Sequence, residues 1–568
     1  MNLTHVFHDE DRGLAISTAF IYKDKCKAIP GGRWDKELRA WRYPFTPFAA
    51  KAIAEQFPPD KSKWSDIAEK LLLESQAIAD SAKYKTAETL PDIPVQKVPA
   101  WHHQKQCFWF TKNLPGAMIA FDMGTGKSRI AIDLIQNREH WATLILCPKS
   151  VVAVWPKEFE KHAVRHYELI TGLEGSVANR VERIRRDLAL ARTRLRPAVV
   201  VLNYEAAWRE PMDDFLLAHK WDCVVLDESH RIKSPSGKSS KFCSRLGDTV
   251  PSRICLTGTP MPHSPLDVYA QYRFLDKGIF GTSFVNFRAR YAVMGGYGNH
   301  EVKGYQNQEE LHEKFYQVAF RVMAKDVQDL PPTVDIVRTC QLSASARAVY
   351  NSIDKEFVAE VGAGMVTVTN ALTKLLRLQQ ITSGFITMDK SDELTRQKAH
   401  IQEIDTAKSE LLLDILTDLK EDEPVAIFCR FHPDLDTIHA IGQSLGRKVL
   451  ELSGRINQLK EWQDGQAPLL AVQMQSGGVG VEMIRACYQV FYSLGYSLGD
   501  YLQARKRTDR PGQTRPVKFI HLVAENTKDT EVYRALENRE EVVESILKTT
   551  RARAAADVHT SHPQPAAV

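Results

Sequence analysis

Short apolar runs separated by amphipathic segments recur through most of the chain. Each run has the length of a buried strand, and segments such as residues 129–135 repeat apolar positions at helical spacing. Strands that are apolar throughout are typical of parallel sheets covered by helices on both faces. The runs lie at residues 118–121, 143–147, 198–203, 223–226 and 254–256, and then at residues 425–429, 449–452, 469–472, 489–492 and 517–522. This pattern predicts an α/β protein with two parallel-sheet lobes.

The region before the first run has a different pattern. Strand-like and helix-like stretches precede a proline-rich linker there: residues 14–22 and 26–30 as strands, 49–57 and 64–84 as helices, and 85–99 as the linker. We therefore expect a small α+β module at the N-terminus.

The full length of 568 residues is enough for three or four domains. A less regular, aromatic-rich stretch between the two lobes predicts a helical insertion, and the Ala/Pro/His-rich end is expected to be disordered. The expected parts are an N-terminal accessory module (1–95), the first lobe (96–278), the insertion or connector (279–334), the second lobe (335–548) and the tail (549–568).

One glycine-bearing turn stands between an apolar run and an amphipathic helix. It reads Met123-Gly124-Thr125-Gly126-Lys127-Ser128. Such a turn can surround phosphate oxygens with backbone N–H groups, while the lysine reaches the β/γ-phosphates and the hydroxyl binds Mg²⁺. The full phosphate-loop pattern has a further glycine where this chain has Phe121, so a plain strand–turn–helix explains the segment equally well on its own.

A pair of adjacent carboxylates could form a nucleotide site together with this turn. Asp227 and Glu228 follow the apolar run at residues 223–226, and ligands collect beyond the carboxyl ends of parallel strands. A Mg–nucleotide site needs one carboxylate for the metal and one for the attacking water. Acidic pairs also cap helices, but the combination with the glycine-bearing turn favours a site that binds ATP and Mg²⁺.

Polar residues near other strand ends suggest further contacts. Gln104 precedes the glycine-bearing turn, and its amide can both donate to and accept from adenine. Lys149 and Ser150 follow the run at residues 143–147, where they suit phosphate contacts of a nucleic acid. The arginine-dense segment 179–196 favours a solvated helix face, with a phosphate-tracking surface as the alternative.

Two tryptophans stand among basic residues near the N-terminus. They are Trp34 and Trp41, with Arg33, Lys36, Arg39 and Arg42 around them. Rings between cations suit a surface that stacks bases and grips phosphates. A small module that buries both tryptophans in its own core explains the pattern at least as well.

The net charge and the cysteines indicate the class of binding partner and the cellular compartment. A net charge of +5 is weak support for a polyanionic partner, so a nucleic-acid site should be a local basic surface. Nine cysteines without a Cys-x-x-Cys pair favour reduced, buried thiols. The sequence contains neither a signal-peptide core nor an apolar run of membrane-span length. We expect a cytoplasmic protein without a membrane partner, in a prokaryotic cell or a phage-infected host.

Taken in order, these segments resemble the Swi/Snf-type DNA translocases of helicase superfamily two, a group of DEAD/DEAH-box proteins. The likeness covers about residues 100–548, and the string 503–513, with its Gln-Ala-x-x-Arg-x-x-Arg-x-Gly-Gln pattern, is the most specific part. Residues 31–35 and 40–44 are similar to the HARP-type module of annealing helicases. The matching segments are 123–128, 146–150, 227–230, 256–260, 427–431, 476–486 and 503–513.

The resemblance implies two RecA-like lobes with ATP between them. Lys127 and Glu228 would act in hydrolysis, Ser128 and Asp227 would hold Mg²⁺, and further nucleotide contacts would come from Gln104, 123–126, Gly480 and Gln503. Arg507 and Arg510, expected on one helical face, would reach the γ-phosphate when the lobes close. Double-stranded DNA would contact Lys149, Ser150, Tyr204, Thr257, Arg430, Ser476 and Gly477.

Three positions depart from the family pattern. Ser229 stands where alanine is usual, Glu482 stands where many relatives carry asparagine, and residues 496–499 replace an aromatic-Asn-Pro string. The departures concern the coupling of the second lobe to DNA more than hydrolysis itself.

Other functions remain open at this point. A strand-separating DNA or RNA helicase would use the same motor, and a non-enzymatic ATP-binding clamp would lack a use for Glu228 and the two arginines. The chain could also be the motor of a restriction or defence complex, or work with partners in DNA repair or replication. The absence of a strand-separating wedge in the sequence favours translocation along duplex DNA.

Overall fold

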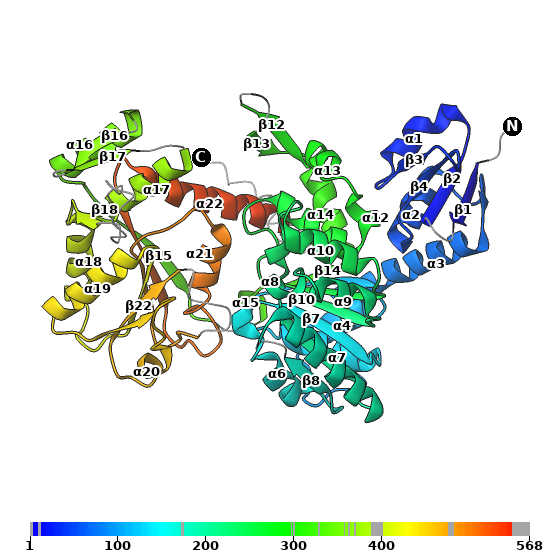
Figure 1. The fold of residues 1–568 in the computed structure, drawn as a ribbon, viewed down its shortest axis with the longest axis horizontal. Coiled ribbons are helices and arrows are strands. Elements are labelled where there is room, and N and C mark those ends of the chain that lie inside the picture. The colour runs from blue at the N-terminus through cyan, green and yellow to red at the C-terminus, as the bar shows by residue number, and fades with distance from the viewer. Residues whose placement is uncertain are drawn as a thin grey trace, which may run out of the picture. The chain divides into compact units, whose positions relative to one another are not determined.

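The computed structural model describes residues 4–9, 13–171, 175–296, 298, 301–327, 330–356, 358–361, 364–367, 371–387, 401–474 and 482–547. It divides into two units, one formed mainly by Met1–Val327 and the other by Gln328–Val542. Figure 1 colours both by position in the chain. Within the described ranges, no helix combines the length and the apolarity that crossing a membrane requires.

The first unit begins with a module built on a five-stranded sheet in the order β3-β4-β2-β1-β5. Its core is apolar and includes Val6, Ile16 and Ile53. Its elements are β1 (His5–Asp9), β2 (Gly13–Ser17), α1 (Lys23–Ala28), β3 (Arg33–Asp35), β4 (Ala40–Tyr43), α2 (Pro47–Gln56), β5 (Lys63–Trp64) and α3 (Asp66–Asp80).

Two strand predictions for this module are wrong in whole or in part, and one alternative is excluded. The strand expected at residues 14–22 ends at Ser17, and Phe20–Tyr22 forms a 3-10 helix. Residues 26–30 were expected as a strand, but Cys26 is the buried residue of helix α1. The apolar spacing there is too short to distinguish one turn of helix from a strand. The module does not bury both tryptophans either, because Trp34 is 50% exposed and packs edge-on against the half-buried Trp41.

The larger part of the first unit is a seven-stranded sheet in the order β14-β6-β11-β10-β7-β9-β8. Every pairing in it is parallel. The strands are β6 (Gly116–Phe121), β7 (Ala142–Cys147), β8 (Glu168–Thr171), β9 (Ala198–Asn203), β10 (Cys223–Asp227), β11 (Ser252–Leu256) and β14 (Ala319–Val322). Strands β6, β9 and β10 are buried along their whole length, as expected for a parallel sheet covered on both faces.

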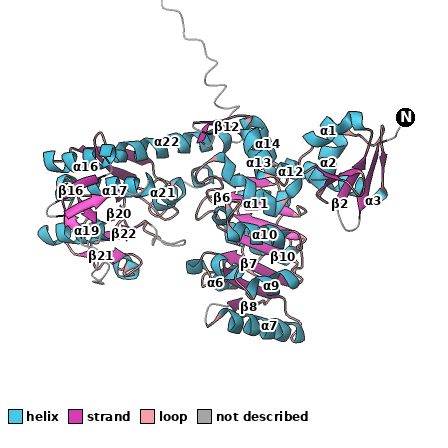
Figure 2. Ribbon diagram, turned by 45° about the horizontal axis from the view of Figure 1, so that its top comes forward, coloured by secondary structure: helices cyan, strands magenta, loops and turns pink. Residues whose placement is uncertain are grey.

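Helices accompany these strands through the first unit (Figure 2). They are α4 (His102–Thr111), α5 (Lys127–Asn137), α6 (Trp155–His162), α7 (Val177–Thr193), α8 (Tyr204–Ala207), α9 (Met212–Ala218), α10 (Lys238–Gly247), α11 (Val268–Leu275), α12 (Lys277–Phe280), α13 (Phe284–Tyr291), α14 (Gln308–Tyr316) and α15 (Ala324–Val327). The arginine-rich α7 makes exposed ion pairs such as Arg185–Glu182, which is typical of a solvated face.

The stretch expected as an insertion contributes to this sheet. After the hairpin of β12 (Ala292–Gly295) and β13 (Glu301–Tyr305), strand β14 pairs in parallel with β6. An irregular, aromatic-rich sequence therefore ends in a strand next to the one that precedes the glycine-bearing turn.

The second unit is organised on a six-stranded parallel sheet in the order β15-β24-β23-β20-β22-β21. Its strands are β15 (Thr333–Cys340), β20 (Val425–Cys429), β21 (Val449–Leu452), β22 (Leu469–Gln473), β23 (Tyr488–Phe491) and β24 (Val517–Ala524). Its helices are α16 (Ala344–Glu356), α17 (Ala371–Thr382), α18 (Ala407–Thr417), α19 (His432–Ser444), α20 (Leu459–Gln463), α21 (Leu498–Arg505) and α22 (Lys528–Leu547). Two short hairpins, β16 (Val358–Val361) with β17 (Gly364–Thr367) and β18 (Phe385–Thr387) with β19 (Ile401–Glu403), complete it.

The expected helix through residues 503–513 is shorter than predicted. Helix α21 ends at Arg505, so Arg507 and Arg510 lie in the turns that follow it and not on one helical face. After Arg505 the chain forms tight turns, in which the Arg507 amide donates to the Ala504 carbonyl and the Thr508 amide donates to the Arg505 carbonyl. Pro511 also excludes a continuous helix through residue 513, because it disfavours helical backbone at the residue before it and lacks an amide donor. Gly512 then takes a positive φ of +96°, which leads the chain out of the turn.

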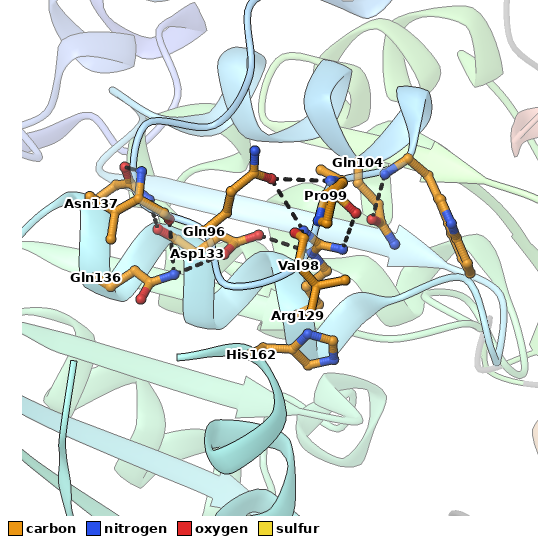
Figure 3. Close-up of polar contacts among 12 residues, drawn as sticks. Gln96, Val98, Pro99, Gln104, Arg129, Asp133, Gln136, Asn137 and His162 are labelled. Carbon is orange, nitrogen blue, oxygen red and sulfur yellow. Dashed lines mark hydrogen bonds and ion pairs between the residues drawn. The ribbon is translucent and has the colours of Figure 1, made fainter. Parts of the chain in front are cut away.

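The predicted linker is fastened to helix α5, although residues 86–101 form no helix or strand. The Arg129 guanidinium donates to the Pro99 carbonyl at 2.9 Å and also to the Val98 carbonyl. The amide of Asn137 exchanges two hydrogen bonds with the backbone of Val95, at 2.8 and 2.9 Å. Figure 3 shows these side chains converging on the linker from one face of the helix. The helix that begins at the glycine-bearing turn is thus held from outside the sheet.

A buried ion pair supports this fastening. Arg129 Nε lies 3.2 Å from Asp133 Oδ2, and both side chains are almost fully buried. Burial raises the pKa of Asp133 to about 6, against the opposing effect of Arg129. The ionised form of Asp133 therefore depends on Arg129, because a buried charge without a partner is strongly unfavourable.

We predict that Arg129→Ala lowers the free energy of unfolding of the first unit by about 3–5 kcal/mol, since it leaves Asp133 buried without its partner. Urea denaturation followed by tryptophan fluorescence measures the change. In the double variant Arg129→Ala/Asp133→Asn the uncompensated charge is gone, so part of the loss should return. A loss below about 1 kcal/mol in the single variant would contradict this account of the fastening.

Candidate active site

The parallel topology brings several predicted residues to one edge of the first sheet. The glycine-bearing turn follows β6, Thr257 follows β11, and Asp227 ends β10. Because these strands are neighbours in the order β6-β11-β10, their carboxyl ends lie side by side. This is the edge at which open α/β sheets bind their ligands.

The turn after β6 has the backbone that a phosphate loop requires. Gly124 and Gly126 have positive φ values of +81° and +95°, which side chains rarely adopt. Met123 and Gly124 precede Thr125, whose hydroxyl donates to the Asp122 carbonyl at 2.8 Å. Helix α5 starts directly at Lys127, so its first N–H groups point toward the turn.

Gln104 holds this turn rather than pointing away from it. Its Nε2 donates to the Thr125 carbonyl at 3.2 Å, and its Oε1 accepts from the Trp101 amide at 3.0 Å. Gly126 has a φ of +95°, which strains any other residue, and a Cβ there would also displace the Gln104 amide, which would lie 2.2 Å from it. His103 Nε2 contacts the same carbonyl at 3.0 Å. The side-chain amide of Gln104, which is predicted to bind adenine, therefore holds the glycine-bearing turn in this structure.

Lys127 and Ser128 begin the helix. The Lys127 ammonium donates to the carbonyls of Phe121 at 2.9 Å and Asp122 at 3.2 Å, at the end of β6. A phosphate would compete with these neutral acceptors for the ammonium. The Ser128 side chain is half-buried at the first turn, where its hydroxyl is an oxygen donor of the kind that Mg²⁺ prefers.

Asp227 is a buried carboxyl with a perturbed pKa. Burial, together with the neighbouring Glu228, raises its pKa to about 7, and Lys127 opposes the rise. Trp155 Nε1 donates to Asp227 Oδ2 at 3.1 Å, which fixes the orientation of the carboxyl. Such a group is stabilised in its charged form by a cation, so the donor set fits a divalent metal.

Glu228 stands in a strained turn. Its φ of 52° and ψ of 53° are left-handed, which costs a non-glycine residue about 1–2 kcal/mol. His230 Nδ1 lies 3.3 Å from Glu228 Oε2 and 3.1 Å from Thr257 Oγ1. The strained carboxylate is thus linked through His230 to the loop after β11.

A second link joins the same two loops. Ser229 donates its hydroxyl to Gln271 Oε1 at 2.7 Å. The amide nitrogen of Gln271 in turn donates to the Pro260 carbonyl at 2.7 Å. No sequence motif indicates Gln271, because one glutamine inside an apolar helix gives no signal until the fold places Ser229 beside it.

The predicted DNA contacts of the first unit separate into two groups. Lys149 and Ser150 are exposed just beyond β7. Tyr204 and Thr257 are buried, and we correct their assignment as DNA contacts. The Tyr204 hydroxyl donates to the Asp227 carbonyl at 2.9 Å, and Thr257 Oγ1 accepts from the Thr259 amide at 3.1 Å. Both side chains support the carboxylate loop from within.

In the second unit, predicted residues also follow the carboxyl ends of strands. Arg430 comes directly after β20, hydrogen bonds to Gln379 Oε1 and packs over the Phe431 ring at 5.2 Å. Gln503 lies half-buried on α21. The predicted residues Ser476, Gly477 and Gly480 lie outside the described residues.

The two arginines after α21 have different surroundings. Arg507 is 2% exposed, and its carbonyl accepts the Met483 amide at 2.9 Å. Arg510 donates to Glu482 Oε1 at 2.5 Å, and burial lowers its pKa. Glu482, the residue that departs from the family pattern, therefore neutralises one of the two predicted arginine fingers.

Comparison with known proteins identifies the family. The model of the SNF2-related domain matches residues 82–384 of this chain. Phage protein p41, from Acyrthosiphon pisum secondary endosymbiont phage 1, is 26% identical over 75% of this chain and 92% of that protein. The bovine DNA annealing helicase and endonuclease ZRANB3 is 25% identical over 82% of this chain, which spans only 42% of that relative.

Two further similarities have the same character. The zebrafish chromodomain-helicase-DNA-binding protein 1-like is 24% identical over 78% of this chain and 43% of its own length. The SWI2/SNF2 ATPase core of Sulfolobus solfataricus, solved in complex with double-stranded DNA, is 22% identical over 81% of this chain and 95% of that chain, with a TM-score of 0.38. The family match covers more than half of the sequence, and the chain therefore belongs to the SNF2-related domain family, the Swi/Snf-type, DNA-dependent ATPase cores of helicase superfamily two.

Proposed function

We propose that the protein hydrolyses ATP in order to move along double-stranded DNA. One observation supports the proposal most directly. A turn with the backbone of a phosphate loop, Lys127 and the Asp227–Glu228 pair all lie at one edge of the seven-stranded sheet. The second unit, with the arginines after α21, would supply the other half of the nucleotide site. Residues 1–95 would be an accessory module, and the motor would work in the cytoplasm, associated with DNA.

In the first lobe, the loop amides and Lys127 would bind the β- and γ-phosphates. Ser128 and Asp227 would hold Mg²⁺, which neutralises phosphate charge when it is bound. The raised pKa of Asp227 supports this assignment. Burial and Glu228 destabilise its charged form, so a bound cation would stabilise that form strongly.

Glu228 would orient and deprotonate the attacking water. Its left-handed backbone is a local strain of the kind found at functional positions, and its contact with His230 links it to Thr257. A change in the loop after β11 would therefore reach the carboxylate through two hydrogen-bonding side chains.

In the second lobe, Arg507 and Arg510 would stabilise charge on the transferred phosphoryl group, an effect worth about 10³–10⁵ in rate for an arginine finger. The proposal requires lobe closure for this step, which would make hydrolysis depend on DNA lying across both lobes. Within the second unit, Arg510 is paired with Glu482.

DNA would be held mainly through its phosphates. Lys149 and Ser150 are exposed beyond β7, and Arg430 lies at the corresponding end of β20. Contacts of this type carry little sequence information, and they weaken as counterions accumulate. We expect binding that is sensitive to salt and nearly independent of sequence.

The assignment of Glu228 is tested by Glu228→Gln. We predict that duplex-stimulated ATP hydrolysis falls by at least about 10²-fold, because the amide cannot accept the proton, while binding of ATP stays within about threefold. Phosphate release is measured with duplex DNA, single strands and RNA, and movement by displacement of a third strand from a triplex. Stimulation by RNA alone, or wild-type turnover in the variant, would refute the proposal.

Asp227→Asn tests the buried carboxyl through stability. Between pH 4 and 7 the native carboxyl stays protonated while the unfolded one ionises, so stability of the wild type declines as pH rises through this window. We predict that the apo variant is more stable than the wild type at pH 8, by at most about 4 kcal/mol, and equal to it near pH 4.

Thermal unfolding at the two pH values measures this difference. Addition of Mg²⁺ and ADP should raise the midpoint of the wild type but not of Asp227→Asn, since the variant lacks the charged ligand. A variant that is less stable at pH 8 would show that the carboxylate is already compensated within the protein.

Glu482→Gln tests the pairing of Arg510. A half-exposed ion pair contributes up to about 1 kcal/mol, so its removal should raise ATP hydrolysis without DNA by about two- to fivefold. Glu421→Gln is the matched control, because Glu421 is an exposed acid of the same unit. An unchanged or reduced basal rate would show that Glu482 does not restrain Arg510.

A further inference from the structure

A basic pocket of about 620 Å³ lies between the N-terminal module and the seven-stranded body of the first unit. The module contributes the hairpin of β3 and β4, and the body contributes α11, α12 and the start of β11. Five of its lining side chains are cationic and two are acidic: Arg33, Arg42, Arg253, Arg273 and Lys277, with Asp35 and Asp248. Pockets of this volume accommodate ligands the size of one nucleotide.

Close backbone packing forms this junction. Gly278 of α12 lies against α2, since a Cβ there would be 2.5 Å from Thr46 Oγ1 and 2.7 Å from the Ala49 amide. Gly281 meets Gly31 in the same way, with a Cβ 2.8 Å from the Gly31 nitrogen. The two walls of the pocket are therefore held together without intervening side chains.

The two carboxylates neutralise only part of the positive charge. Arg42 lies 3.0 Å from Asp35, and Lys277 lies 2.5 Å from Asp248. Arg33 is exposed and has no ion-pair partner among the described residues. The pocket therefore retains a net positive charge even with both pairs formed.

The remaining two arginines donate to neutral groups. Arg273 Nε donates to Ser244 Oγ at 2.9 Å, and Arg253 donates to the Gly247 carbonyl at 3.3 Å, although Asp276 and Asp248 also act on Arg253 at longer range. Each guanidinium group keeps N–H groups that these hydrogen bonds do not use. Their planar arrangement matches the oxygens of a phosphate.

The hairpin brings two of the cations together. Arg33 and Arg42 are direct cross-strand partners in the β3–β4 register, and only Arg42 has its charge balanced by Asp35. The neighbouring pair is Trp34 and Trp41, of which Trp34 is 50% exposed at the rim of the pocket. Paired cations beside an exposed indole are the groups that bind the backbone and the bases of an unpaired strand.

We propose that this pocket binds the phosphodiester backbone of an unpaired DNA strand, with a base against Trp34. The site is separate from the sheet edge that holds Lys127 and Asp227, and the choice of DNA rests on the proposed function. A motor that moves on duplex while its front module holds a single strand would act preferentially where the two forms meet.

The test uses the full-length chain and fluorescein-labelled oligothymidylate of 20 nucleotides. Arg33→Ala/Lys277→Ala should weaken binding about tenfold, and should reduce the slope of log affinity against log salt by about 1.4, the loss of two single-strand phosphate contacts. Trp34→Ala should weaken the same complex by at least about fivefold without changing the slope, since stacking releases no counterions.

Lys61→Ala/Lys70→Ala is the matched control, because it removes two exposed charges from the same module outside the pocket. The control should bind like the wild type, and both double variants should keep duplex-stimulated ATP hydrolysis within about twofold. If the proposed function is wrong, duplex DNA does not stimulate ATP hydrolysis by the wild type. If only the pocket assignment is wrong, that stimulation is present and Arg33→Ala/Lys277→Ala binds the single strand like the wild type. Equal binding by the two double variants, or a loss confined to duplex DNA or to ATP, would overturn the proposal.

Discussion

Two adjacent carboxylates at the buried end of a strand set the conditions for the rest of this site. Burial raises the pKa of Asp227 to about 7, and repulsion from the neighbouring Glu228 adds to the rise. Lys127 compensates only in part, and its ammonium also donates to the carbonyls of Phe121 and Asp122. The apo site therefore favours a ligand that brings positive charge to the acids and negative charge to the lysine, which describes a metal-bound nucleotide.

Polar side chains hold the surrounding loops in place from several directions. Gln104 fastens the phosphate loop, Arg129 fastens its helix to the preceding segment, and Gln271 connects Ser229 with Pro260. None of these groups needs to touch a nucleotide. Each is buried and hydrogen bonded, so each orders a loop that the apolar core does not reach.

The sequence alone predicted most of the framework because fully buried parallel strands are near-continuous apolar runs. Residues 198–203, 425–429 and 449–452 are strands with the expected bounds. The failures occurred where the signal is short or depends on tertiary context. Residues 26–30 fit a helical turn as well as a strand, and the helix expected to carry Arg507 and Arg510 already ends at Arg505. The burial of Tyr204 and Thr257 follows from side-chain packing, which no motif spacing encodes.

The strand order also constrains how the protein is made. Strand β6, which leads into the glycine-bearing turn, pairs with β11 and β14, and these come far later in the chain. During synthesis the β6 strand therefore remains an uncovered edge until the ribosome has passed Val322. Nascent chains in which elongation pauses before β14 would present this apolar strand to chaperones, and the glycine-bearing turn is among the last parts of the first unit to acquire its native neighbours.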